Sequence, residues 1–227
     1  MEIRSSTWIS KSFWVFQKDI KSELRTRYGL NALLMFAVVT LTAVSFAVGQ
    51  FFSSPKLISS LFWIVVFFSS MSGLAQVFIK EEESKTVSLL KLVASNESIF
   101  LGKLFFNLIL LFLLELIIVP LFLILLGVQI KNFGLFVFVV LLGTVGLVCA
   151  TTIIAAIVAK AHVKGALFAV LSFPILLPLL ITVIYGTNLA FEGSEFSQGW
   201  NELKVLISYC VVMGVGSFLL FDFVWRE

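Results

Sequence analysis

Long apolar runs alternate with short polar segments along almost the whole chain. A helix that crosses the hydrocarbon core of a bilayer needs about 20 consecutive, mainly apolar residues. Six runs have about this length, and we predict spans at residues 30–52, 57–79, 104–128, 134–159, 166–188 and 204–223. The connection at 129–133 is so short that the third and fourth spans should form a tight hairpin. The pattern therefore predicts an all-α polytopic membrane protein.

The composition supports a membrane protein and argues against a soluble one. Hydrophobic residues make up 60% of the 227 residues, and 25 residues are phenylalanine, whereas soluble domains are about 45–50% apolar. The net charge of +3 does not indicate nucleic-acid binding, because the lysines and arginines cluster at the ends of the apolar runs. Such clustering is typical of topology signals, so we expect no nucleic-acid partner.

The positive charges lie mainly on one side of the predicted spans. Of the 16 lysines and arginines, 13 precede the first span, follow the second and fourth spans, or end the chain. The other three are Lys56, Lys131 and Lys204. Because cytoplasmic segments carry the excess of positive charge, both termini are predicted to lie in the cytoplasm.

Residues 8–28 predict a basic amphipathic helix before the first span. At 100° per residue, Phe13, Phe16, Ile20 and Leu24 share one face. The basic residues of this segment are Lys11, Lys18, Lys21, Arg25 and Arg27, and the first four of them lie on the opposite face. We expect such a helix to lie in the plane of the cytoplasmic head groups. The alternative is a solvated basic segment.

The segment 80–103 is the longest one between spans on the cytoplasmic side. Its acidic residues, Glu81 to Glu83, come before Lys85 and Lys91, which is the order that a helix dipole favours. Apolar residues follow on one face, and Asn96 is expected to cap a helix that re-enters the membrane. Apolar residues exposed to the cytosol indicate docking on a partner protein. The alternative is an ordinary connector with a soluble glutamate run.

Three segments carry a recognisable family pattern. The first contains Lys18, Asp19, Glu23, Arg25, Thr26 and Arg27; the second contains Glu82, Glu83, Thr86, Leu89, Leu90, Leu101, Gly102 and Lys103; the third is residues 141–181. In this order and with six spans, they resemble the cytochrome c maturation protein B family, the haem exporter B proteins. Many relatives have a glycine before the threonine, where this chain has Lys85.

The resemblance implies a fold and a set of partners. The fold is an ABC-2-like, type V-like permease, with residues 1–227 forming a single transmembrane permease domain in the inner membrane of a bacterium. The partners are a second copy of the chain, two copies of a cytosolic ATP-binding cassette subunit, a haem-handling membrane subunit, a small membrane helper and a periplasmic haem chaperone. Residues 80–103 would form the coupling loop, and its ATPase-coupling residues would be Glu81, Glu82, Glu83, Thr86, Leu89, Leu90 and Gly102.

The chain itself is not expected to be an enzyme. It contains no GxxxxGK[ST] phosphate-binding loop, so ATP would be bound and hydrolysed by the partner subunit. We predict no catalytic residue, no metal site and no directly bound cofactor. His162 is the single histidine, so the chain lacks a pair of axial haem ligands of this type. Haem would be handled by the complex, and we favour release of haem-loaded chaperone over haem movement through this subunit.

Four residues inside the predicted spans are candidates for a transport path or a conformational switch. Glu115 lies near the middle of the third span, where an ionised acid costs about 3 kcal/mol on insertion scales. Pro120, Pro174 and Pro178 each remove a backbone donor and favour a kink, and two of them in one span indicate a broken or bent helix. The alternatives are a helix–helix hydrogen bond for Glu115 and static kinks for the prolines.

Three other functions remain compatible with these residues. An ABC-2 exporter subunit for a lipid or a small amphiphile would share the fold and the coupling loop. An ion-coupled secondary carrier would use Glu115 as its proton site and would need no ATPase. A scaffold without transport activity would keep its function when the ATPase partner is inactive.

Overall fold

All the secondary structure described in the computed structural model is helical, as predicted. The structure describes residues 8–48, 54–74, 76–161 and 164–225. Within them the helices are α1 (Trp8–Thr26), α2 (Tyr28–Val48), α3 (Pro55–Leu74), α4 (Gln76–Glu83), α5 (Val87–Val93), α6 (Asn96–Leu126), α7 (Phe133–Ala159), α8 (Lys164–Glu192) and α9 (Trp200–Trp225). His162 and the last residues of the predicted span 30–52 lie outside the described residues.

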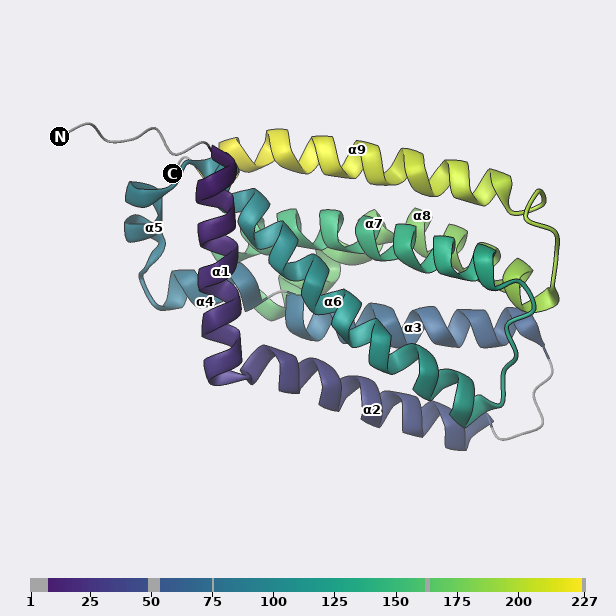
Figure 1. Ribbon diagram of the computed structural model, residues 1–227. Helices are drawn as coiled ribbons and strands as arrows, with labels where there is room; N and C mark the ends of the chain where they lie inside the picture. Colours follow the sequence, from purple (N-terminus) through teal and green to yellow (C-terminus); the bar gives the residue numbers. More distant parts are fainter. Residues whose placement is uncertain (1–7, 49–53, 75, 162–163, 226–227) are drawn as a thin grey trace.

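Six helical stretches are long and apolar enough to cross a membrane, which confirms a polytopic architecture. They are α2, α3 continued by α4, α6, α7, α8 and α9. These helices run side by side, whereas α1 runs across one end of the bundle and the short α5 projects from the same end (Figure 1). We call this the inner end. The beginning of α1 and the end of α9 both lie there, as an even number of spans requires.

The interior of the bundle is built around α7. This helix packs against α3, α4, α6, α8 and α9, and small residues allow the close approach. A Cβ atom added at Gly146 would lie 2.8 Å from Leu179 Cδ1. The buried Trp63 of α3 donates from Nε1 to Thr187 Oγ1 of α8 at 2.8 Å. A second buried cluster at the inner end joins residues of α1, α4, α5, α6, α7, α8 and α9.

The predicted hairpin between the third and fourth spans is present, and the fifth span, predicted to be broken or bent, is one unbroken helix. Gly127 ends α6 in the left-handed conformation, with φ of 64°. Asn132 caps α7 by accepting a hydrogen bond from Leu135 N at 3.1 Å. By contrast, α8 continues through Pro174 and Pro178, and α6 continues through Pro120. Helices tolerate proline within a membrane because neighbouring groups satisfy the freed carbonyls.

Candidate coupling site at the inner end of the bundle

The helix α1 is seated on the first turns of α6. Its side toward the bundle carries Ser12, Val15 and Asp19, which are buried. A Cβ atom added at Gly102 would lie 2.7 Å from Val15 Cβ and 2.8 Å from Ser12 O. Ser98 Oγ donates to the carbonyl oxygen of Trp8 at 3.0 Å. The absence of a side chain at position 102 is therefore what lets the two backbones approach.

The expected two-faced division of α1 was incomplete. Phe16 and Ile20 are half-buried against the bundle, but Phe13 is 63% exposed and Leu24 62% exposed. The side toward the protein is a third face, made mainly of small and polar residues. A helix at the edge of a membrane bundle can meet protein, bilayer and water, whereas a division into an apolar and a polar side distinguishes only two environments.

The predicted basic residues of this helix differ in how far they are exposed. Lys21, Arg25 and Arg27 are exposed, and Lys11 is half-buried. Arg27 follows the end of α1 and has a positive φ of 53°, so it forms part of the turn into α2. Lys18 instead turns toward the bundle, where it joins a group of charges.

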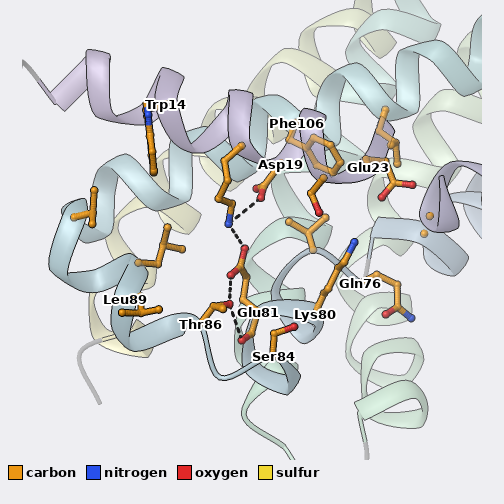
Figure 2. Close-up of a pocket in the computed structure, with 18 residues that line it drawn as sticks. Trp14, Asp19, Glu23, Gln76, Lys80, Glu81, Ser84, Thr86, Leu89 and Phe106 are labelled. Carbon is orange, nitrogen blue, oxygen red and sulfur yellow. Dashed lines mark hydrogen bonds and ion pairs between the residues drawn. The ribbon is translucent and has the colours of Figure 1, made fainter. Parts of the chain in front are cut away.

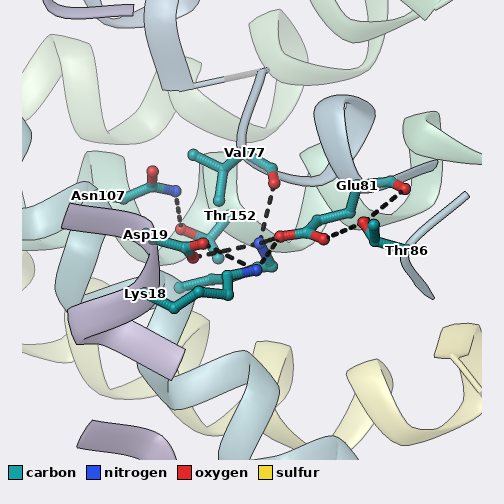
Figure 3. A network of polar contacts seen from close by, with 8 residues as sticks. Lys18, Asp19, Val77, Glu81, Thr86, Asn107 and Thr152 are labelled. Carbon is teal, nitrogen blue, oxygen red and sulfur yellow. Dashed lines mark hydrogen bonds and ion pairs between the residues drawn. The ribbon is translucent and has the colours of Figure 1, made fainter. Parts of the chain in front are cut away.

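Four charged side chains meet beneath α1, and we call Lys18, Asp19, Glu81 and Lys103 the inner charge cluster (Figure 3). Lys103 Nζ lies 3.2 Å from Asp19 Oδ2 and 3.2 Å from Glu81 Oε1, and it donates to Val77 O at 3.0 Å. Lys18 Nζ pairs with Glu81 and lies 3.1 Å from Asp19 Oδ1. Two acids and two bases balance, as buried charges require.

The charge state of Lys18 follows from these neighbours. Burial by itself lowers the pKa of Lys18, because the charged form loses hydration. The carboxylates of Asp19 and Glu81 outweigh this effect and raise the pKa of Lys18 above its ordinary value. Lys18 therefore stays charged at neutral pH, and the cluster ties α1 firmly to α4 and α6.

The turn between α4 and α5 is fastened to the same cluster. Thr86 Oγ1 donates to Glu81 Oε2 at 2.5 Å, and Thr86 N donates to Glu81 O at 3.1 Å. Lys85 before it has a positive φ of 54°. A single acid, Glu81, thus contacts groups from α1, α6 and the start of α5. This carboxylate is therefore one of the groups that hold the start of α5.

The helix α5 presents an apolar face outward at the inner end. Leu89 is 64% exposed, Leu92 is 83% exposed and Val93 is 54% exposed. We call these three residues the α5 apolar patch. On the opposite side, Leu90 is buried in the inner-end core, and Lys91 Nζ lies 5.8 Å from the centre of the Trp225 ring. Leu92 faces away from the bundle, whereas Leu89 and Val93 also line a cavity between α5 and α1.

Several predicted coupling residues do not lie on this surface. Glu81, Leu90 and Gly102 are buried among residues of the same chain, so they do not lie on the exposed surface of the inner end. Gly102 is buried because α1 covers the start of α6, and Leu90 is buried in the inner-end core, neither of which the sequence of the loop alone reveals. Glu82 is half-buried and Glu83 exposed. Leu92, at the tip of the patch, was not among the predicted residues.

The re-entry into α6 also differs from the expected cap. Ser95 is the N-cap residue and Asn96 is the first residue of the helix. The Asn96 side chain donates from Nδ2 to Asp222 Oδ1 in α9 at 2.9 Å. It therefore links the coupling segment to the last helix instead of capping its own. The sequence therefore predicted correctly that a helix begins near Asn96, but not that the Asn96 side chain binds α9.

Glu115 lies apart from the inner charge cluster, deep in α6. It is 3% exposed, and Thr144 Oγ1 of α7 lies 2.6 Å from each of its carboxyl oxygens. Twelve residues of helix separate it from Lys103, or about 18 Å at 1.5 Å per residue. The structure thus contains the helix–helix hydrogen bond that was one of two alternatives for this residue.

Comparison with known proteins agrees with the architecture. A model of the CcmB protein family matches residues 10–224, nearly the whole chain. No individual curated protein matches the chain. The matched residues include nearly all of α1, the inner charge cluster, the α5 apolar patch and almost all of the bundle.

Proposed function

The chain belongs to the CcmB protein family, and we propose that its inner end receives the motion of a separate cytosolic ATPase and passes it into the membrane. The family consists of membrane subunits involved in cytochrome c maturation, which act as permease subunits of ABC complexes and are not themselves catalytic. We propose which surface of this chain the ATPase binds and what the resulting motion does.

The α5 apolar patch is the observation that carries this proposal. Leu89, Leu92 and Val93 are large apolar side chains on a short helix that projects from the inner end. An exposed cluster of this kind at the cytoplasmic surface marks a protein interface. We propose that the ATPase binds the patch in a groove of its own, with Glu82 and Glu83 at the rim of the contact.

The inner charge cluster provides a path from the patch into the bundle. A displacement of α5 pulls on Glu81 through Thr86, and Glu81 is bound to Lys18 of α1 and Lys103 of α6. Separating these groups would leave buried charges unpaired, which is costly. We therefore propose that α1, α4, α5 and the start of α6 move as one body when the ATPase binds and hydrolyses ATP.

The proposed result of this motion is release of a haem-loaded periplasmic chaperone. The chain has one histidine, in the short segment between α7 and α8, which makes it a poor source of two axial haem ligands. In this scheme, haem is bound by a separate haem-handling membrane subunit, assisted by a small membrane helper. Two copies of this chain would pair with two ATPase subunits in the inner membrane of a bacterium, with both termini in the cytoplasm.

Copurification tests the docking proposal with a matched control. The variant is Leu89→Ala combined with Leu92→Ala, and the control is Leu219→Ala combined with Leu220→Ala on the exposed face of α9. Each protein is purified from detergent-solubilised membranes, and associated proteins are identified by mass spectrometry. We expect wild type and control to retain the ATPase, and the α5 variant to lose at least about 90% of it, equivalent to about 1.4 kcal/mol.

The amount of the membrane protein itself distinguishes lost docking from lost folding. Because both substituted leucines of α5 are exposed, the variant should accumulate and elute as wild type does. A wild-type protein that carries no ATPase would overturn the proposal and return attention to a proton-coupled carrier, with Glu115→Gln as the next variant. Equal retention of the ATPase by both double variants would show that the patch is not the interface.

A further inference from the structure

We propose that the inner end binds one phospholipid of the cytoplasmic leaflet that carries a primary ammonium, a phosphatidylethanolamine. Its head group would occupy the cavity between α1, α4 and α5, and one acyl chain would lie in the groove between α2 and α6. The argument for this site does not rest on the proposed ATPase coupling, although Leu89 and Val93 of the α5 apolar patch also line the cavity. It rests on two adjoining hollows and on the charges at one end of them.

The first hollow is a cavity of about 420 Å³ at the inner end. Figure 2 shows its two sides: Trp14 and Leu89 lie on one, and Lys80, Glu23 and Gln76 lie on the other. Phe106 and Leu110 of α6 extend the lining toward the membrane interior. The cavity therefore has a polar region near the inner surface and an apolar region that leads into the bundle.

The second hollow is an apolar groove of about 250 Å³ between α2 and α6. Its lining includes Leu30, Leu33, Leu34, Leu110, Leu113 and Ile117, all of them aliphatic. Nearer the outer end of the bundle the two helices come together, where Ser45 Oγ donates to Leu125 O at 3.3 Å. The groove is thus a wedge that lies in the inner half of the membrane.

The two hollows adjoin. Leu110 lines both of them, and Gly29 of the cavity is followed directly by Leu30 of the groove. A ligand that fills both must be polar at the inner surface and aliphatic at membrane depth. A membrane lipid has this division, whereas a segment of a cytosolic protein would have to bury its backbone within the bilayer.

The charges of the cavity favour a zwitterionic head group. Lys18, Asp19 and Glu81 bind one another and Lys103 in the inner charge cluster. Lys80 is exposed and takes no part in that cluster, so it can bind a phosphate.

Glu23 supplies the negative charge on the same side of the cavity. Its Oε1 accepts a hydrogen bond from Leu30 N at 2.8 Å, which holds the carboxylate in place and leaves Oε2 for a ligand. A cation and a fixed carboxylate match the phosphate and the ammonium of phosphatidylethanolamine. A choline head group has no N–H donor for Glu23. Phosphatidylglycerol could place its phosphate on Lys80, but it has no cation for Glu23.

Competition among lipids tests the assignment. The protein would be reconstituted in nanodiscs with equal amounts of phosphatidylethanolamine, phosphatidylcholine and phosphatidylglycerol, then transferred to mild detergent, and the retained lipid would be measured by native mass spectrometry. We expect phosphatidylethanolamine to be retained at least threefold over each of the others. Equal retention of phosphatidylcholine, or preference for phosphatidylglycerol, would overturn the proposed head-group contacts.

Two variants and one control place the lipid in the site. Leu113→Trp should fill the groove, because Leu113 is 47% exposed and lines it. Leu219→Trp makes the same change on the exposed face of α9, at a residue that is 60% exposed. We expect Leu113→Trp to abolish selective retention and Lys80→Ala to reduce it about threefold, while Leu219→Trp retains the lipid as wild type does. Equal retention by both tryptophan variants, in proteins that elute normally, would refute the site.

Discussion

Replacing Lys103 by methionine tests whether the inner charge cluster holds the inner end together. Lys103 is 1% exposed, and its ammonium lies 3.2 Å from both Asp19 and Glu81. Removing one partner from a buried ion pair costs about 3–5 kcal/mol, because the other charge is left uncompensated. Lys18 remains to neutralise part of the acid charge, so we expect the lower limit, about 3 kcal/mol.

Thermal unfolding in detergent, followed by tryptophan fluorescence, measures this loss. A change of 1 kcal/mol shifts Tm by about 2–4 °C for a chain of this size, so Lys103→Met should lower Tm by about 6–12 °C. Lys18→Met is the matched control, because the Lys18 side chain is 33% exposed. Water can compensate the carboxylates on that side, and we expect a loss of about 1 kcal/mol.

The double variant separates the charge balance from the packing of the side chain. Combining Lys103→Met with Glu81→Gln leaves Lys18 and Asp19, whose charges cancel, and the amide oxygen of the glutamine can still accept from Thr86. We expect the double variant to lose about 2 kcal/mol less free energy of unfolding than the two single variants lose when their losses are added. Strictly additive losses, or a Lys103→Met protein within about 0.5 kcal/mol of wild type, would refute the reasoning.

Three further predictions concern separate parts of the structure. Gly102→Ala should lower the free energy of unfolding by about 1–3 kcal/mol, because the added methyl group forces α1 away from α6. Gly216→Ala in α9 meets no atom within 4 Å and should not lower it, since alanine is the better helix former; thermal unfolding of both variants checks this. Thr86→Val removes the hydroxyl that binds Glu81 but leaves the α5 apolar patch unchanged, so the ATPase should still copurify while ATP-driven chaperone release falls. Thr86→Ser should restore release. A normal release rate in the valine variant would contradict the proposed path. Glu115→Gln keeps a group that can hydrogen-bond to α7, so stability and chaperone release should both stay near wild type; a folded protein without release would instead assign Glu115 a role in the mechanism.

Much of the architecture could be predicted from the sequence because insertion into a bilayer depends on local composition. About 20 apolar residues in a row can satisfy their backbone only as a helix, so the six spans followed from hydropathy alone. The helix at 8–28 was also recognised, since its basic and apolar residues separate at helical spacing. The family resemblance was confirmed over residues 10–224, because it rested on motifs in a fixed order along the chain.

The sequence determined which segments enter the membrane, and the tertiary structure decided which polar residues of the inner end are buried. Asp19, Glu81 and Lys103 are far apart in the chain and come from three helices, so no local pattern indicates that they neutralise one another. No local pattern indicates the role of Gly102 either: it was predicted as a coupling residue, and the structure shows that α1 packs on it. Hydropathy is a property of neighbouring residues, whereas charge pairing and close approach depend on which distant helices share a surface.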